Sequence, residues 1–216
     1  VRFLALAGLF FGSPWVSRRK QTTGPPPTDG PELVQLETAQ AYELLSRVNM
    51  QEHNLPFAAY CAYRALTFGL SLPHLTPVVA RAYASLCLSS AADKRPKEAK
   101  EFRTLALSSC KELNELGLFA YTLTAAAVNE ASQGLWDAAD ANLKEARRMS
   151  EQLGDMWQWE EAVSQMAHLE FYRSNFRESK ALYQEAADSA SIRKDVKMAN
   201  RCQAGIAGVL LAVGEV

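Results

Sequence analysis

Apolar residues recur at intervals of three and four positions from Glu32 onward, which is the period of an α-helix and not the alternation of a strand. In the same region Pro and Gly become scarce, while Ala and Leu become frequent. The pattern therefore predicts an all-α fold over residues 32–216.

The helical pattern repeats with a period of about 40 residues. The clearest copies are residues 134–146 (GLWDAADANLKEA) and residues 174–186 (SNFRESKALYQEA). Small side chains allow paired helices to approach within about 8–10 Å, so the small positions should mark the helix crossings. The row of small residues predicted for the second helix of each copy is Ala65, Ala106, Ala146 and Ala186.

The first helix of each copy has rows in the same register. One row is large, with Tyr42, Tyr83, Leu123 and Val163, and is broken by Gln203. The next two rows are Leu45, Leu86, Ala126, Met166 and Ile206, and Ser46, Cys87, Ala127, Ala167 and Ala207. A single helix pair cannot bury such a face, whereas a stack of pairs makes one continuous core.

With these rows, and with a glycine-like turn at Gly134 or Ser174, the chain resembles the tetratricopeptide repeat (TPR) over residues 37–214. The resemblance comprises four complete units and the first helix of a fifth. It implies a right-handed superhelical stack of antiparallel helix pairs, a TPR-like α-solenoid. The period is about 40 and not 34, and the closing proline is missing, so HEAT-like pairing is the structural alternative.

A narrower resemblance is carried by several segments, of which WQWEEA at residues 157–162 is the most distinctive. These segments are similar to the C-terminal helical array of multidomain signalling proteins that also contain a class III adenylate or guanylate cyclase domain and an ATPase domain. The resemblance implies a regulatory, protein-binding scaffold whose catalytic domains lie upstream of Val1. The alternative is a stand-alone TPR peptide-binding adaptor with no attached enzyme.

The sequence before the repeats falls into two segments. Residues 1–20 contain an apolar run followed by basic residues, and three interpretations stay open: the end of a preceding domain, a truncated membrane span, or a signal-peptide remnant. Residues 21–31 (QTTGPPPTDGP) predict a Pro-rich linker. Because the apolar run at residues 209–213 reaches the end of the sequence, we expect the array to be truncated at its C-terminus.

Charge and cysteine usage restrict the class of protein further. A net charge of −1 lacks the excess of basic residues needed to neutralise phosphates, so we expect no nucleic-acid partner, and membrane binding is not favoured. Four cysteines without C-x-x-C spacing predict buried thiols in a reducing compartment, and hence a cytoplasmic location. They are Cys61, Cys87, Cys110 and Cys202.

Catalytic motifs are missing from the sequence. It contains no phosphate-binding G-x-x-x-x-G-K-[ST] loop, no H-E-x-x-H zinc motif and no G-x-S-x-G nucleophile elbow. We therefore expect no catalytic residue, no metal and no cofactor, and no enzyme activity in this segment. The adjacent Glu160 and Glu161 suit a helix start, the Arg193-Lys194 pair suits a solvated helix end, and Gly205, Gly208 and Gly214 suit close helix contacts.

The partner is expected to be a protein or peptide, including other domains of the parent protein. In a right-handed array the first helices line the concave face, and stripes beside the packed rows would contact the partner. An Asn stripe typical of carboxylate-clamping TPR domains is replaced here by Leu88, Val128 and His168, which favours an apolar or helical peptide. The alternative is that Phe171 and Tyr172 only pack on the next repeat. The predicted partner-binding residues are Arg81, Tyr121, Glu161, His168, Phe171 and Arg201.

Overall fold

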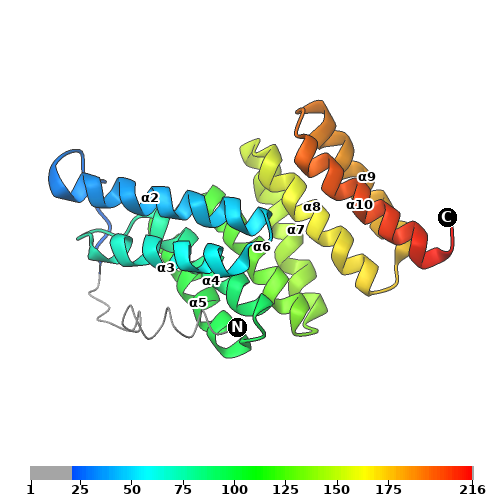
Figure 1. The fold of residues 1–216 in the computed structure, drawn as a ribbon, viewed down its shortest axis with the longest axis horizontal. Coiled ribbons are helices and arrows are strands. Elements are labelled where there is room, and N and C mark those ends of the chain that lie inside the picture. Colours follow the sequence, from blue (N-terminus) through cyan, green and yellow to red (C-terminus); the bar gives the residue numbers. More distant parts are fainter. Residues whose placement is uncertain (1–20, 216) are drawn as a thin grey trace. The chain divides into compact units, whose positions relative to one another are not determined.

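The computed structural model describes residues 21–215, and these form a succession of α-helices joined mostly by short turns (Figure 1). Within this range there is no strand, only an isolated bridge between Thr22 and His74. The predicted all-α fold is thus confirmed. In chain order the helices are α2 (Gly30–Gln51), α3 (Leu55–Ser71), α4 (Pro77–Ala92), α5 (Pro96–Leu113), α6 (Leu116–Ser132), α7 (Trp136–Leu153), α8 (Met156–Tyr172), α9 (Phe176–Ile192) and α10 (Val196–Val213).

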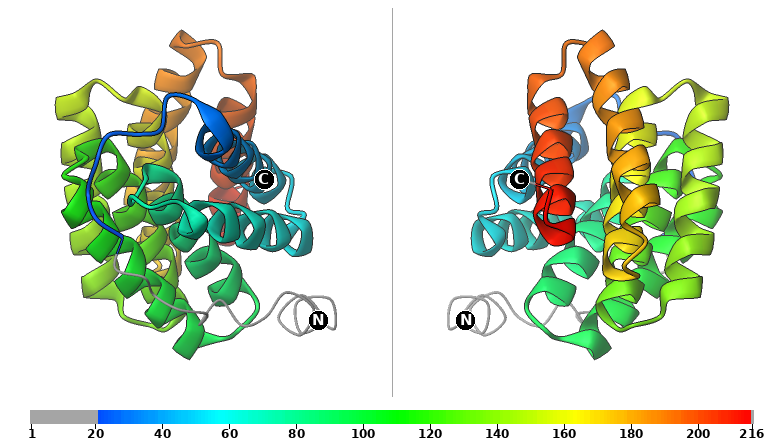
Figure 2. Two further views of the ribbon diagram at one scale, coloured as in Figure 1. Left: turned by 90° about the vertical axis from the view of Figure 1, so that its left-hand side faces the viewer. Right: turned by 90° about the vertical axis from the view of Figure 1, so that its right-hand side faces the viewer.

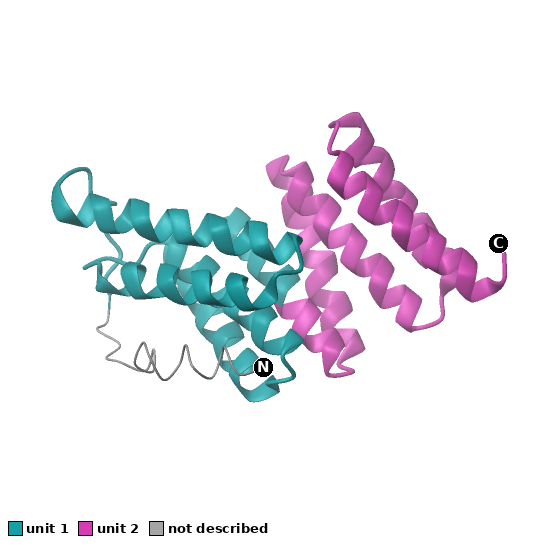
Figure 3. Ribbon diagram, viewed as in Figure 1, with its two compact units in different colours: residues 1–125 teal, residues 126–216 magenta. Residues whose placement is uncertain are grey.

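The chain divides into two compact units, coloured separately in Figure 3. Unit 1 contains residues 21–125 of the described chain, and unit 2 contains residues 126–215. The division falls within α6. In unit 1 the helix pairs are α2/α3 and α4/α5, and in unit 2 helices α7, α8, α9 and α10 each pack antiparallel on the next (Figures 1 and 2).

The predicted row of small residues lies at the helix crossings. Ala65, Ala106, Ala146 and Ala186 all have zero exposed surface, which confirms the register of the repeat. In α8, Val163, Met166 and Ala167 are buried as the first-helix rows require. Leu45 of α2 and Ala207 of α10 are exposed, because within the described residues these two helices are packed from one side only.

Every turn between the described helices except the α3–α4 connection contains one residue in the left-handed conformation. Within the helix pairs this residue is His53, Lys94, Gly134 or Ser174, and between pairs it is Asn114, Gly154 or Lys194. The amide that follows usually closes a six-residue turn, as where Asp155 N donates to Ser150 O at 2.9 Å. This is the Schellman ending of a helix, and it reverses the chain within three or four residues.

The three C-terminal glycines have different roles. A Cβ at Gly205 would lie 2.5 Å from the Tyr183 ring, so the predicted close helix contact is confirmed there. At Gly208 no atom lies within 4 Å of a Cβ, and Gly214 is a left-handed residue that ends α10 with φ +77°. For these two the expectation of helix packing is wrong.

Residues 21–29 are extended, and the beginning of this segment lies against the loop between α3 and α4. The Gln21 amide donates to the carbonyls of Gly69 and Leu72, both at 2.9 Å, and Leu75 N donates to Thr22 O at 3.0 Å. Helix α2 then begins at Gly30, two positions before the predicted domain start. The expectations for residues 1–20 lie outside the described residues, and the role of residues 21–31 as a linker stays a prediction.

Candidate partner-binding pocket

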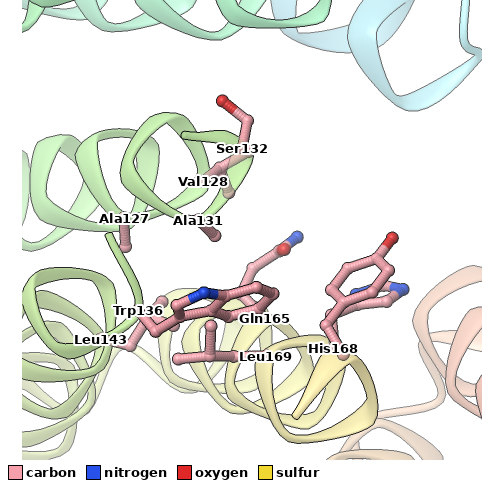
Figure 4. Close-up of a pocket in the computed structure, with 10 residues that line it drawn as sticks. Ala127, Val128, Ala131, Ser132, Trp136, Leu143, Gln165, His168 and Leu169 are labelled. Atoms are coloured by element: carbon pink, nitrogen blue, oxygen red, sulfur yellow. The ribbon is translucent and has the colours of Figure 1, made fainter. Parts of the chain in front are cut away.

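Unit 2 contains a cavity of about 480 Å³ bounded by the C-terminal half of α6, the start of α7 and one face of α8 (Figure 4). Its surface is mainly apolar, with a few hydrogen-bonding groups between aromatic and aliphatic side chains. The lining residues are Ala127, Val128, Ala131, Ser132, Trp136, Leu143, Gln165, His168, Leu169 and Tyr172.

Local sequence explains how the walls form. On α8, Gln165, His168, Leu169 and Tyr172 are spaced by three and four residues and therefore share one helix face. Opposite them, Trp136 begins α7 directly after the left-handed turn at Gly134. Its indole lies 6.3 Å from the Tyr172 ring, so aromatic groups from two helices meet at the pocket.

His168 is the pocket residue whose electrostatics are most strongly set by its surroundings. Its ring meets Tyr183 of α9 edge to face, with centroids 5.4 Å apart. Burial of the imidazole lowers its pKa, and the positive charge of Arg201 lowers the pKa further, while Glu161 acts in the opposite direction. The neutral imidazole is thus favoured, which suits an apolar ligand.

A polar network borders the pocket on α8. Arg201 of α10 donates to Glu161 Oε2 at 2.5 Å and to Ser164 Oγ at 3.1 Å. The Gln165 amide, which lines the pocket, donates to Glu161 Oε1 at 3.0 Å. The Glu161–Arg201 pair therefore orients a pocket residue.

The structure brings together some of the predicted partner-binding residues. Glu161 and Arg201 are paired and His168 lies in their electrostatic field, all within unit 2. Phe171 is half-buried and packs on Phe176, with ring centroids 5.6 Å apart, so it lies outside the pocket lining. The alternative was that Phe171 and Tyr172 only pack on the next repeat. Phe171 does pack on another helix, but this helix is α9 of the same repeat.

The two remaining predicted residues, Arg81 and Tyr121, lie in unit 1. The Tyr121 hydroxyl is 3.4 Å from Ser85 Oγ. Burial raises the pKa of Tyr121, and the carboxylate of Glu43 raises it further. The hydrogen bond with Ser85 and the positive charge of Arg81 lower this pKa. Participation of Arg81 and Tyr121 in partner binding stays a prediction.

Sequence reasoning missed Trp136 and Gln165, and it weighed Tyr172 without assigning it to the site. The sequence did contain a signal for Trp136. It is a large residue directly after the turn of a helix pair, and such a residue lies beside the end of the first helix of that pair, here α6. The pairing of α6 with α8 that creates the cavity involves side chains about 40 residues apart, and no local pattern reveals its volume.

Other candidate chemistry is accounted for by packing. The four cysteines are buried and form no disulfide within the described residues, and burial raises the pKa of the Cys202 thiol to about 11. In residues 21–215 no three His, Cys, Asp or Glu side chains are grouped so as to hold a metal ion. The helices of this same range include none with both the length and the hydropathy to cross a bilayer.

Comparisons with known proteins place the fold in a class. No protein-family model and no curated protein matches the sequence. Among solved structures, BtubC (BKLC) from P. vanneervenii has a TM-score of 0.59 at 15% identity, covering 87% of this chain and 86% of its own. PilF of Pseudomonas aeruginosa has a TM-score of 0.51 at 18% identity, covering 82% of this chain and 78% of its own. Both are TPR-like helical repeat proteins, and the chain shares that fold.

Proposed function

We propose that the chain is a protein-interaction scaffold and that the pocket of unit 2 receives an apolar side chain from a peptide segment of its partner. The observation that carries this proposal is the contact between Trp136 and Tyr172 in the lining of a cavity of about 480 Å³. Tyr172 is 64% exposed, although its ring already contacts two other aromatic groups. Tyr and Trp at the centre of a pocket are the residues that most often dominate binding energy.

The size and polarity of the pocket support a peptide ligand. Ligand pockets typically occupy about 300–1,000 Å³ and combine apolar walls with a few polar groups that fix orientation. Here the polar groups are Ser132, Gln165 and the neutral imidazole of His168. A helix in a groove, with apolar anchors one turn apart, fits the two facing helices α6 and α8.

A random-peptide display library provides the test. Peptides selected on the full chain should bind Trp136→Ala at least tenfold more weakly, because truncation of a central aromatic anchor typically costs about 2 kcal/mol or more. Tyr172→Ala should weaken the same peptides. Affinities would be measured by isothermal titration calorimetry, with circular dichroism showing that each variant retains its helix content.

The matched control is Ile192→Ala. Ile192 is 84% exposed, lies at the end of α9 in the same unit and does not line the pocket. It should leave peptide affinity unchanged. Peptides that bind Trp136→Ala and Tyr172→Ala as tightly as the unaltered chain would contradict the proposal.

The wider role proposed for this scaffold is regulation within a larger signalling protein that carries a nucleotide cyclase and an ATPase domain. Support comes from the sequence resemblance centred on residues 157–162. A stand-alone peptide-binding adaptor is the alternative, and both proposals place the chain in the cytoplasm without enzyme activity of its own. Sequencing upstream of Val1 distinguishes them, since a cyclase or P-loop domain there supports the first and a start codon close to Val1 supports the second.

A further inference from the structure

Unit 1 contains a second cavity, of about 400 Å³, that differs from the pocket of unit 2 in its chemistry. It lies where the extended segment 21–29 passes between α2, the start of α4 and the turn from α5 to α6. The residues that line it are Thr23, Gly24, Pro26, Leu36, Gln40, Leu75, Thr76, Pro77, Glu112, Leu113 and Glu115. Its walls thus combine aliphatic side chains with two carboxylates.

Thr76 is a buried polar residue of this cavity without a partner. Thr76 is 3% exposed, and its Oγ1 makes no hydrogen bond to any residue that the structure describes. A buried hydroxyl left unpaired has lost its hydrogen bonds to water and gained none in return, so its retention points to a ligand that completes its hydrogen bonding.

Comparison with the other repeats reinforces this point. Asp155 and Asp195 precede α8 and α10, and each accepts a hydrogen bond from the first turn of its helix, at 3.1 and 3.0 Å. Thr76 and Glu115 occupy the corresponding positions before α4 and α6. Thr76 makes no such cap. Thr76 and Glu115 line the same cavity.

The charged side chains that line the cavity are both acidic. Glu112 lies in the last turn of α5, where the helix dipole already concentrates negative charge, so the carboxylate is unfavourably placed without a cation. The neighbouring residues 21–46 include four acidic side chains and no Lys or Arg. Lys111 is the basic residue in the last turn of α5, but it does not line the cavity.

The start of α4 does not turn the cavity into a site for anions. A helix N-terminus attracts anions through its free N–H groups. Here Pro77 has no N–H, and Val79 N already donates to Thr76 O at 3.0 Å. The acceptors of Glu112, Glu115 and Thr76 therefore outweigh the donors available at this helix end.

We propose that this cavity binds an arginine side chain of a protein partner. The guanidinium donates to the carboxylates of Glu112 and Glu115 and to Thr76 Oγ1, while its methylene groups pack on Leu36 and Leu113. A planar group with five donors matches several acceptors arranged around one space, whereas the ammonium of lysine is a point charge that matches them less well. A hydrated metal ion would leave the aliphatic walls unused.

The probe for the experiment is N-acetyl-L-argininamide, titrated into the full isotope-labelled chain and followed by amide chemical shifts in NMR spectra. We expect saturable shifts at Leu75, Thr76 and Val78 and at residues 112–116. The apparent affinity for N-acetyl-L-lysinamide should be at least fivefold weaker, and the neutral isostere N-acetyl-L-citrullinamide should give no saturable shift. Equal shifts with the arginine and citrulline compounds, or no saturable binding of the arginine compound, would overturn the proposal.

Variants identify the groups responsible. Glu112→Gln together with Glu115→Gln should abolish the shifts, whereas Glu151→Gln, an exposed carboxylate in unit 2, should leave them unchanged. Thr76→Val, which removes only the hydroxyl, should weaken binding several-fold while keeping the melting temperature at or above that of the unaltered chain. Binding that survives the double glutamine variant would overturn the proposal. Trp136→Ala should not alter this titration, so failure of the unit 2 pocket and failure of the arginine site are distinguishable.

Discussion

Arg193 at the end of α9 forms a two-point ion pair with Glu160 of α8, whose side chain is completely buried. Arg193 Nε lies 2.9 Å from Glu160 Oε1, and Nη2 lies 2.6 Å from Oε2. Ser189 Oγ donates to the same carboxylate at 2.7 Å. Glu160 is thus an anchor between two helices, and the interpretation of the Arg193 side chain as a solvated helix end is wrong.

Arg193→Met should destabilise the chain by about 3 kcal/mol. The hydrogen bonds from Arg193 are made to a carboxylate that has no access to water, and removing one partner of a buried pair leaves an uncompensated charge, which typically costs about 3–5 kcal/mol. We expect the lower end of this range because the Arg193 side chain is one-third exposed. Urea denaturation followed by circular dichroism measures the loss.

The exposed pair Arg148–Glu145 supplies the control, since Arg148→Met should leave the urea midpoint essentially unchanged. The double variant Glu160→Leu with Arg193→Met should recover much of the stability lost in Arg193→Met alone, because no buried charge remains unpaired. A double variant as unstable as the single one would show that shape, and not charge, governs this contact.

Two glycines of α10 should respond to alanine in opposite directions. Gly205→Ala brings a Cβ to 2.5 Å from the Tyr183 ring, and overpacking of this kind costs about 1–3 kcal/mol. Gly208→Ala meets open space and should stabilise the helix by about 0.5–1 kcal/mol. Melting temperatures of the two variants check the pair, and a shift of the same sign in both would contradict the packing of α9 on α10.

Titration of His168 should make the chain less stable in mild acid. In the folded state its pKa is lower than the ordinary value of about 6.5. At a pH between the folded and the ordinary pKa, the unfolded chain therefore binds more protons than the folded chain. The free energy of unfolding therefore rises with pH across this window, and the contribution is lost as the pH falls through it. The charged and titratable groups around the ring are Arg201, Glu161 and Tyr183.

The comparison is between the unaltered chain and His168→Gln, which keeps the other two histidines and the surrounding charges. Going from about pH 7 to about pH 5, where histidine titrates, the unaltered chain should lose more stability than the variant. Equal losses in the two proteins, measured by urea denaturation at each pH, would show that His168 does not contribute.

The helices and their register were predictable because each repeat places the same size of side chain at the same crossing. Ala146 and Ala186 identify that crossing in the sequence, and both are fully buried. The role of Glu160 was not predictable, because its partner Arg193 comes from another helix and the sequence around Glu160 also suits a helix start. The same reason hid the cavities, since the distance between Trp136 and Tyr172 depends on how α6, α7 and α8 pack.

The sequence predicted turns at Gly134 and Ser174 from their place in the repeat. Gly134 marks a turn in the sequence, but the corresponding position is Lys94 in one repeat and Ser174 in another, and all three residues are left-handed. The Schellman hydrogen bonds, such as that from Arg95 N to Ser90 O at 2.9 Å, hold the backbone in this conformation whatever the side chain. Backbone geometry is therefore repeated more strictly than the residue type.

Lys194→Gly should stabilise the chain, because Lys194 has φ +62° and occupies the position taken by Gly154 in the preceding turn between pairs. A left-handed conformation costs a non-glycine residue roughly 1–2 kcal/mol, of which the greater freedom of glycine in the unfolded chain takes back about 0.5–1 kcal/mol. The net gain should be up to about 1 kcal/mol in urea denaturation. The reverse substitution, Gly154→Ala, has open space for its Cβ and should cost about 1 kcal/mol through the backbone alone. A lower urea midpoint for Lys194→Gly would contradict this prediction. It would show that the Lys194 side chain stabilises the fold by more than its backbone strain destabilises it.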